Sequence, residues 1–378
     1  MTRTNMPGRW KEMKLIEVSQ SISAGGTPRR DKKEFWNNGT IPWLKISDMK
    51  DTYISKTNEK ITENGLKNSS AKLFPKGTLV YSIFATLGAI GILEINATTN
   101  QAIVGITPKK EIIDTKYLYY CLQSERNKIL EKKSHATQDN LNLGILKNHI
   151  ISVPPLPIQD KIVLILEKAE KLKEFRKEAD ELTNEFLRSV FLEMFGDERK
   201  NTKKFEIKGF LDVFDTTTGK LDSNASVEDG KYPFFTCSQE TFKIDKYSFD
   251  CEALLLAGNN AAAKYSIKHY KGKFDVYQRT YILTLKNNSE LYSFYHYQLE
   301  QKLGELQNKS IGTNTKYLTL GILRDIKIIC PSLPLQNKFA SIVKEVESMK
   351  EQQKYSKEKL DNLFNVLMQK AFNGELIK

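Results

Sequence analysis

The sequence lacks the long apolar runs, the cysteine pairs and the histidine clusters that mark membrane, secreted and metal-binding proteins. No stretch of its 378 residues approaches the roughly 18 apolar residues of a membrane span, and residues 1–10 are polar and basic, unlike a secretory leader. The cysteines Cys121, Cys237, Cys251 and Cys330 show no CxxC spacing, and the histidines show no metal-ligand spacing. We therefore expect a cytoplasmic protein with reduced thiols, no membrane partner and no metal site.

Motifs of catalysis are also missing. The sequence has no Walker A phosphate loop, no Asn/Asp-Pro-Pro-aromatic segment of the amino-methyltransferase kind, no GxSxG turn and no HExxH helix. The glycines around Gly88 and Gly91 resemble a dinucleotide loop only weakly, because the full GxGxxG and a following acidic residue are absent. Glu193 and Asp197 form no recognisable acid–base pair. We predict a binding protein that is not an enzyme and that carries no cofactor.

What the chain does have is an excess of positive charge. Its formal net charge is +12 and its isoelectric point is about 9.2. An excess of this size favours a polyanionic partner, most often a nucleic acid. The alternative is a lysine-rich proteome with no such partner.

Two related stretches organise the sequence. Residues 154–196 and 331–374 each begin with a proline-rich segment, continue through Gln and Lys, and reach a Gly after a long apolar-periodic run. Gln159 matches Gln336 at an offset of 177 residues. Because solenoid repeats are only about 20–50 residues long, an offset this large indicates a duplicated pair of domains.

Apolar residues in both stretches recur at steps of three and four, which predicts one long helix in each. The first series is Ile158, Ile162, Ile165, Ala169 and Leu172, which resumes beyond Arg176 at Leu182, Phe186, Val190 and Met194. The second is Leu335, Phe339, Ile342, Val346 and Met349, which resumes beyond Gln353 at Leu360, Phe364, Met368 and Phe372. We expect the two helices to form an intramolecular antiparallel coiled coil. Two separate amphipathic helices, each packed on its own domain, are the alternative.

A second set of correspondences precedes each helix. Residues 10–18 align with residues 205–213, and Asn100–Ala102 align with Tyr277–Arg279. Strands are expected at Thr78–Phe84, Ile103–Ile106, Ile150–Val153, Ala253–Ala257, Thr280–Leu285 and Ile326–Ile329. Helices rich in aromatic residues, whose rings we expect in the core of each domain, are predicted at Tyr117–Leu122 and Phe294–Leu299. We predict an α+β fold in which two β-rich mixed α/β domains, related by an internal pseudo-twofold repeat, are joined by the two long helices. The expected boundaries are 1–153 for the first domain, 154–200 for the central helix, 201–330 for the second domain and 331–378 for the C-terminal helix.

The loops between these shared elements carry basic and amide side chains that differ between the two copies. Asn and Gln suit the edge of adenine, whereas Arg and Lys suit guanine and phosphate. Gln101 and Gln278 occupy matching positions, so we favour a structural role for them. The candidate DNA-binding residues are Arg29, Arg30, Lys32, Gln138, Asn140, Asn142, Asn259, Asn260, Lys264, Arg279, Asn314 and Lys316. For each of them, stabilisation of its own loop is the alternative role.

The order of short motifs resembles the specificity (S) subunit family of type I restriction-modification systems. The first half has GGTP (25–28), IPW (41–43), SIFATLGAIGI (82–92), TNQAI (99–103), ATQDNLNLG (136–144) and PPLPIQ (154–159). The second half has YPFF (232–235), LLLAGNN (254–260), YQRTY (277–281) and PSLPLQ (331–336), and it departs from the first in lacking the GGTP and IPW forms.

This resemblance implies a non-catalytic protein that reads a bipartite double-stranded DNA site, one half-site for each domain. It also implies partners: two methyltransferase (M) subunits docked on the helices, and restriction (R) subunits in the same complex. Two other classes stay open on the residues alone. One is a coiled-coil scaffold with two protein- or carbohydrate-binding domains, and the other is a divergent nuclease.

Overall fold

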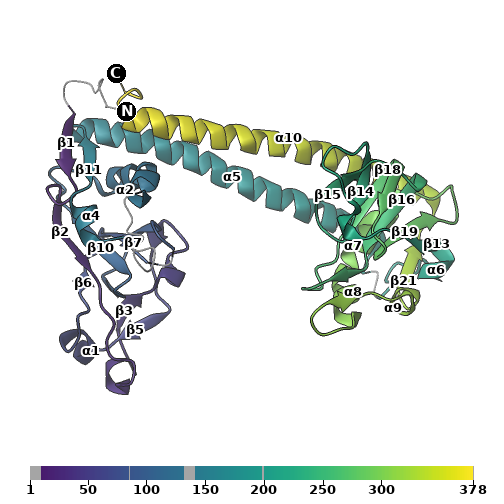
Figure 1. The fold of residues 1–378 in the computed structure, drawn as a ribbon, viewed down its shortest axis with the longest axis horizontal. Coiled ribbons are helices and arrows are strands. Elements are labelled where there is room, and N and C mark those ends of the chain that lie inside the picture. Colours follow the sequence, from purple (N-terminus) through teal and green to yellow (C-terminus); the bar gives the residue numbers. More distant parts are fainter. Residues whose placement is uncertain (1–9, 85, 132–140, 198–199, 378) are drawn as a thin grey trace. The chain divides into compact units, whose positions relative to one another are not determined.

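Two helices of 40 residues each, α5 (Leu156–Phe195) and α10 (Leu333–Phe372), are shared between two units of the chain. The computed structural model describes residues 10–84, 86–131, 141–197 and 200–377 (Figure 1). The first unit consists of residues 1–176 and 356–378, and the second of residues 177–355.

The first unit is built on two sheets and a two-stranded ribbon. The five-stranded sheet has the order β2 (Ser19–Ala24), β10 (Ile103–Pro108), β7 (Leu79–Ser82), β8 (Ile90–Leu93) and β4 (Tyr53–Ile54). The four-stranded sheet has the order β5 (Glu59–Ile61), β3 (Ile41–Leu44), β9 (Ala97–Thr99) and β6 (Leu73–Phe74). The ribbon pairs β1 (Lys11–Lys14) with β11 (Ile150–Val153). The short helices are α1 (Glu63–Lys67), α2 (Thr115–Ser124), α3 (Arg126–Leu130) and α4 (Leu143–Lys147), with 3-10 turns at Lys33–Phe35 and Ile46–Asp48.

The second unit has one larger sheet and two ribbons. The six-stranded sheet has the order β13 (Phe214–Thr218), β19 (Thr280–Leu285), β16 (Phe249–Ala257), β18 (Ile267–Val276), β14 (Tyr232–Phe235) and β15 (Thr241–Ile244). The ribbons pair β12 (Glu206–Gly209) with β21 (Lys327–Cys330) and β17 (Asn259–Asn260) with β20 (Lys316–Tyr317). The short helices are α6 (Phe210–Val213), α7 (Tyr292–Gln301), α8 (Leu303–Lys309) and α9 (Leu320–Arg324), with a 3-10 turn at Ser223–Ala225.

The two units repeat one plan, and the predicted fold class is confirmed. The antiparallel trio β2-β10-β7 corresponds to β13-β19-β16, and each unit closes with a ribbon that precedes a long helix. The strands and aromatic helices expected from the sequence are present with ends shifted by a few residues. The aromatic side chains of α2 and α7 belong to the core, since Tyr117, Phe294 and Tyr295 are completely buried.

One buried glutamine joins the start of each long helix to its unit. The amide of Gln159 accepts from the backbone N–H of Asp114 (2.8 Å) and donates to the carbonyls of Ile112 and Pro154. Gln336 does the same in the second unit, accepting from Leu291 N–H (3.1 Å) and donating to Pro331 O (3.0 Å). The matching glutamines of the sequence repeat therefore satisfy backbone groups in the loop before α2 or α7.

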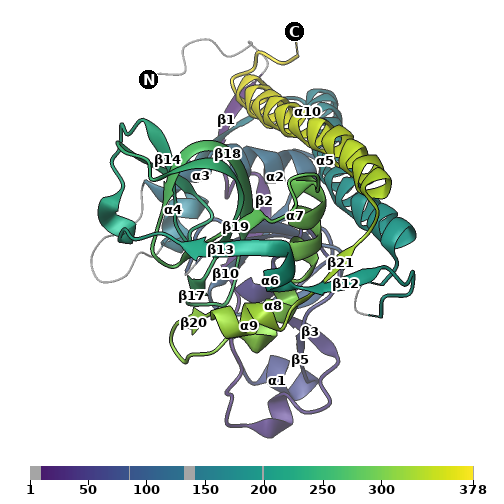
Figure 2. The ribbon, with the colours of Figure 1, turned by 90° about the vertical axis from the view of Figure 1, so that its right-hand side faces the viewer.

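The long helices run antiparallel and lie side by side in both views (Figure 2). In the first unit, Lys173 of α5 bonds Asp361 of α10 (2.8 Å), and its ammonium lies 4.9 Å from the ring centre of Phe364. In the second unit, Gln353 of α10 donates to the hydroxyl of Thr183 on α5 (2.7 Å). Residues later in α5 thus contact residues earlier in α10, as expected for antiparallel helices.

The contact between the helices agrees with the seam expected on α5 at Ile162 and Ala169, but it differs from that seam between Leu172 and Phe186. The buried positions run from Ile162 through Leu166 and Ala169 to Thr183 (7% exposed) and Leu187 (5% exposed). The positions expected at Leu172, Leu182 and Phe186 were wrong, because Leu182 and Phe186 are 57% and 54% exposed. Leu182 and Phe186 instead belong to a second apolar series, which lies one residue before the buried Thr183 and Leu187 and faces solvent.

Gln353, which was thought to interrupt the seam, belongs to it. Gln353 is 9% exposed and bonds Thr183, so this pair fills a buried layer of the helix contact with a hydrogen bond. A buried polar pair of this kind favours one register, since a shifted register would leave its groups unpaired. On α10 the expected Phe339, Val346, Phe364 and Met368 are buried, whereas Met349 is half exposed.

Each end of the helix pair is built into the core of one unit. Ile162, Val163 and Leu166 of α5 share a core with Met368 and Phe372 of α10 and with α2. In the second unit, Phe191 and Phe195 pack against Phe339 and Phe294, with ring centres 4.9 to 6.2 Å apart. Burial of aromatic rings at both ends explains why long helices that are highly charged in the middle remain attached to the sheets.

Replacing Gln159 or Gln336 by Leu removes the partners of buried backbone groups. Each unsatisfied group costs roughly 1–3 kcal/mol, and we expect the melting temperature of the affected unit to fall by about 2–4 °C per kcal/mol. Calorimetry of the full chain measures this. The matched control is Gln352→Leu, at an exposed position of α10, which should melt like the wild type; an equal loss in the control would contradict the assigned role.

Candidate nucleic-acid interface

In each unit, backbone hydrogen bonds join loops that are far apart in the sequence. In the first unit, Ile83 N–H donates to Ala102 O (2.8 Å) and Leu141 N–H donates to Ile83 O (3.1 Å). In the second unit, Gly258 N–H donates to Arg279 O (2.9 Å) and Leu318 N–H donates to Gly258 O (2.8 Å). We call these four the frame bonds. They need only backbone groups, so the same scaffold can hold different side chains.

The paired glutamines add a fourth loop to each cluster. Gln101 accepts from the hydroxyl of Thr27, in the loop after β2. Gln278 donates to Asp222 (2.9 Å), in the loop after β13. This agrees with the structural role that matching positions suggested for Gln101 and Gln278.

All six candidate residues of the second unit fall in one cluster. Asn259 and Asn260 form β17 and pair with Tyr317 and Lys316 of β20. The side-chain oxygen of Asn260 accepts from the N–H groups of Ala262 (2.9 Å) and Lys264 (3.2 Å), which fixes the turn that presents Lys264. The frame bond to Gly258 brings in Arg279.

A hairpin carries the remaining candidate, Asn314. Ile311 and Tyr317 exchange both backbone bonds, with Tyr317 N–H to Ile311 O at 2.8 Å, and Asn314 is exposed between them. Asn314 and Lys316 therefore stand on a short, backbone-bonded arm next to β17.

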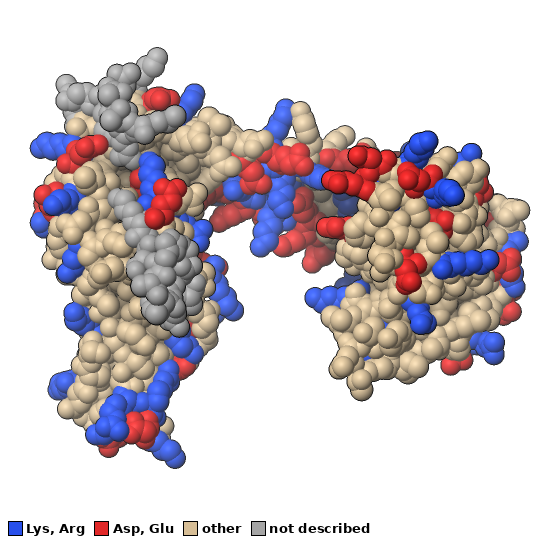
Figure 3. All heavy atoms as spheres, in the orientation of Figure 1, with Lys and Arg blue, Asp and Glu red and all other residues tan. Residues whose placement is uncertain are grey.

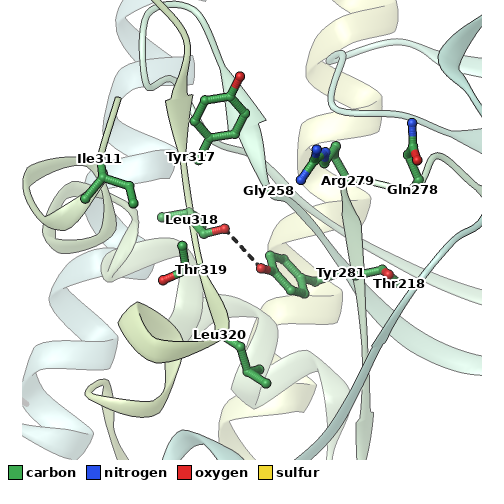
Figure 4. Close-up of a pocket in the computed structure, with 10 residues that line it drawn as sticks. All are labelled: Thr218, Gly258, Gln278, Arg279, Tyr281, Ile311, Tyr317, Leu318, Thr319 and Leu320. Atoms are coloured by element: carbon green, nitrogen blue, oxygen red, sulfur yellow. Dashed lines mark hydrogen bonds between the residues drawn. The ribbon is translucent and has the colours of Figure 1, made fainter. Parts of the chain in front are cut away.

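A cavity of about 420 Å³ lies between this arm and the segment around Arg279 and Tyr281 (Figure 4). It is lined by Thr218, Gly258, Gln278, Arg279, Tyr281, Ile311, Tyr317, Leu318, Thr319 and Leu320. The hydroxyl of Tyr281 donates to Leu318 O (3.0 Å), and burial raises the pKa of Tyr281 above its usual value. Tyr281 thus remains a neutral donor that holds the arm to β19.

The three candidate cations of the first unit are arranged differently, because each has an acidic partner. Arg29 pairs with Asp31 (2.7 Å) and Lys32 lies 3.9 Å from Glu34. Arg30 pairs with Glu59 (2.5 Å). Among the described residues, no ion pair is found for Arg279, Lys264 or Lys316, so the candidate cations of the second unit are not neutralised by neighbours.

Arg30 also contacts two tryptophans, and sequence reasoning did not predict this contact. Its guanidinium lies 3.7 Å from the ring centre of Trp36 and 4.6 Å from that of Trp43. Desolvation raises the pKa of Glu59, but hydrogen bonds from Lys45 and Arg30 outweigh it, and the pKa lies below its ordinary value. The sequence offered no signal for this group, because Arg30 and Glu59 are 29 residues apart.

The other candidates of the first unit are placed only in part. Asn142 is exposed and caps α4, with its side-chain oxygen accepting from Gly144 N–H (2.7 Å). Thr319 caps α9 at the matching position of the second unit. Gln138 and Asn140 lie outside the described residues.

Positive charge is concentrated away from the long helices. Together α5 and α10 contain 14 Lys and Arg against 14 Asp and Glu, so the whole net charge of +12 lies in the rest of the chain. Figure 3 shows cations and anions interspersed along these helices. Electrostatic attraction of a polyanion would therefore come from the segments outside the two long helices.

The described residues offer little else that could serve chemistry. They include no group of three or more His, Cys, Asp and Glu side chains that could hold a metal ion. The four cysteines are not in disulfides. No helix within the described ranges is long and apolar enough to cross a membrane.

Comparisons with known proteins point to one family. The model described as "Type I restriction modification DNA specificity domain" matches residues 7–183 and 199–362. The MjaIX specificity subunit of Methanocaldococcus jannaschii is 25% identical over 382 residues, covering 89% of this chain and 87% of that protein. The EcoDI specificity subunit of Escherichia coli is 35% identical over 167 residues, or 43% of this chain and 36% of that protein.

Solved structures share the fold. A chain from work titled as the complex assembly and conformational transition of the type I R-M system matches with a TM-score of 0.67 and 18% identity, covering 98% of this chain and 100% of that one. The S subunit from M. genitalium matches with a TM-score of 0.59 and 16% identity, covering 98% of this chain and 99% of that one.

The frame bond at Gly258 predicts a sensitive position. A Cβ added there would strike the carbonyl oxygen of Arg279 and approach the ring of Tyr281. We expect Gly258→Ala to cost roughly 1–3 kcal/mol through overpacking and to weaken DNA binding by displacing Arg279. Gly304→Ala in α8 is the matched control, because its Cβ would meet nothing within 4 Å.

Thermal melting and DNA binding of the two variants give the readout. Gly304→Ala should be neutral or slightly stabilising. If Gly258→Ala melted and bound DNA like the wild type, the close approach of these two loops would be disproved.

Proposed function

This chain belongs to the type I restriction-modification DNA specificity family, and on that premise we propose how its two units divide the work of reading DNA. Its function is DNA sequence recognition within a restriction-modification complex. We propose that each recognition domain, residues 1–153 and 201–330, binds one half of a bipartite, gapped double-stranded site. The single observation that carries this is the set of frame bonds, present twice with different exposed side chains.

The proposed contacts are divided between positioning and reading. Lys32, Lys264 and Lys316 are exposed or half-exposed cations suited to phosphate, which fixes register without carrying sequence information. Arg29, Arg30, Asn142, Asn259, Asn260, Arg279 and Asn314, together with Gln138 and Asn140, are proposed to face the bases or their flanking phosphates. Glu59 limits the reach of Arg30, because it already pairs with that guanidinium.

We further propose that the chain itself has no catalytic residue and works with two methyltransferase subunits and with restriction subunits, in the cytoplasm where the DNA is. The long helices, residues 154–200 and 331–378, would dock the methyltransferase subunits. An outer stripe on α5 (Leu172, Phe175, Leu182 and Phe186) supports this, because its members are about half exposed and are spaced by three, seven and four residues. Such spacing places them on one face of a helix.

The half-site division predicts the result of a domain exchange. Replacing residues 10–150 by the same region of another family member should change one half of the methylated motif and leave the other half as it was. Sequencing of methylated genomic DNA from strains that carry each chain provides the motif. A change in both halves would refute independent reading.

The outer stripe predicts that two neighbouring residues of α5 behave oppositely. Phe186→Ala should leave the melting temperature almost unchanged but weaken methyltransferase binding by roughly 10-fold or more, since exposed aromatic residues often dominate interfaces. Leu187→Ala removes a buried side chain and should cost roughly 2–5 kcal/mol of stability, with docking retained below its melting point.

Calorimetry of the chain and titration with the methyltransferase subunit separate these effects. If Phe186→Ala destabilised the chain as much as Leu187→Ala, Phe186 would belong to the helix contact and the outer stripe would not be a docking face.

A further inference from the structure

The shared frame places different side chains at one matching position of the two units. The frame bond from Ile83 N–H ends on the carbonyl of Ala102, and that from Gly258 N–H ends on the carbonyl of Arg279. Ala102 and Arg279 each follow the paired glutamines Gln101 and Gln278. Arg279 is therefore a long cationic side chain at a position where the first unit has a methyl group.

The backbone of Arg279 is fixed. Its carbonyl accepts from Gly258 N–H (2.9 Å) and from the thiol of Cys237 (3.5 Å). The turn that carries it is closed by Thr280 N–H donating to Tyr277 O (2.8 Å). A side chain that starts from so constrained a point loses less conformational freedom on binding than one on an open loop.

Tyr317 lies near the far end of the Arg279 side chain. The guanidinium carbon of Arg279 lies 6.0 Å from the ring centre of Tyr317, at the outer limit of a cation–π contact (Figure 4). Tyr317 is itself held by two backbone bonds to Ile311 and by the pairing of β20 with β17. A ring in this position can support one face of a guanidinium while its N–H edge stays open to solvent.

The charge of Arg279 is available as well as its geometry. Arg29 and Arg30 each pair with a carboxylate, whereas no ion pair to Arg279 is found among the described residues. A planar guanidinium whose backbone is fixed, whose tip lies near an aromatic ring and whose charge is not neutralised suits bidentate donation to a planar acceptor pair. In the major groove, O6 and N7 of guanine form that pair.

We propose that Arg279 reads a guanine in the half-site bound by the second unit, with Tyr317 as its positioning residue. This inference rests on the proposed function, because it assigns a base to one side chain of that interface. A phosphate contact by Arg279 is the competing role, and it makes a different prediction: uniform loss of affinity for all sequences.

The experiment uses the full chain in complex with its methyltransferase subunits and a DNA pool that is randomised across the half-site. The wild-type motif is expected to contain a guanine that Arg279→Ala no longer selects, with discrimination at that base pair falling roughly 5- to 150-fold, the equivalent of about 1–3 kcal/mol. Arg279→Gln should move the preference at the same position towards adenine.

Four further variants separate base reading from charge and from folding. Lys264→Ala, which removes an exposed cation of the same loop cluster, should weaken binding to all sequences and leave the motif unchanged. Tyr317→Ala should reduce discrimination at the same guanine although Arg279 is intact, and Tyr317→Phe should restore it. Because Arg279→Lys keeps the charge, it should retain the salt dependence of binding but lose most of the preference for guanine.

The outcomes separate a failure of the role assigned to Arg279 from a failure of the proposed function. An unchanged motif with uniformly weaker binding in Arg279→Ala, or a wild-type half-site without guanine, overturns the assignment of Arg279 and leaves the proposed function standing. A wild-type complex that selects no sequence overturns both.

Discussion

Backbone hydrogen bonding between loops is the constraint on which the recognition surface depends. In both units a strand-end amide donates to the turn that carries Ala102 or Arg279, and its own carbonyl accepts from the segment that leads into α4 or α9. Backbone groups are common to all residues, so these bonds persist when side chains change. The fold can therefore keep its loops together while their exposed residues differ, as the proposed reading of two different half-sites requires.

The long helices obey a different constraint. Their ends lie in the cores of the two units, whereas their middle layers contain polar residues such as Thr183 and Gln353. Their charges cancel, and the positive excess lies in the remaining segments. Different positions of the same helices therefore have different roles. The ends attach the helices to the two cores, the middle fixes their register, and the outer face carries exposed apolar residues.

Much of this architecture could be predicted from the sequence, because the duplication is regular. The offset between Gln159 and Gln336 fixed the correspondence of the halves, and alternating or helical apolar patterns located the main strands and helices. The phase of α5 could not be predicted, since Leu182 and Phe186 form a second apolar series next to the buried one. Periodicity counts apolar positions but does not say which of two adjacent series meets the partner helix.

The site was less accessible to sequence reasoning. Loop composition identified Asn259, Lys264 and Arg279, but their grouping depends on backbone bonds between segments far apart in the chain. The pairing of Arg30 with Glu59 and its contact with Trp36 left no local signal. The capping role of Asn142 did leave a local sequence signal, because Asn directly before an apolar helical run is a typical N-cap.

Hydrogen exchange of the full chain, bound to its methyltransferase subunits with and without DNA that contains its motif, tests the central claim directly. The amides of Gly258 and Leu318 make frame bonds and should exchange slowly in both states. The amides of residues 312–315, at the tip of the hairpin, should exchange quickly in the complex without DNA and slow down when DNA binds. Fast exchange at Gly258 and Leu318 without DNA, slowed only by its addition, would contradict the account, because the loops would then be assembled by the DNA rather than held ready by the fold.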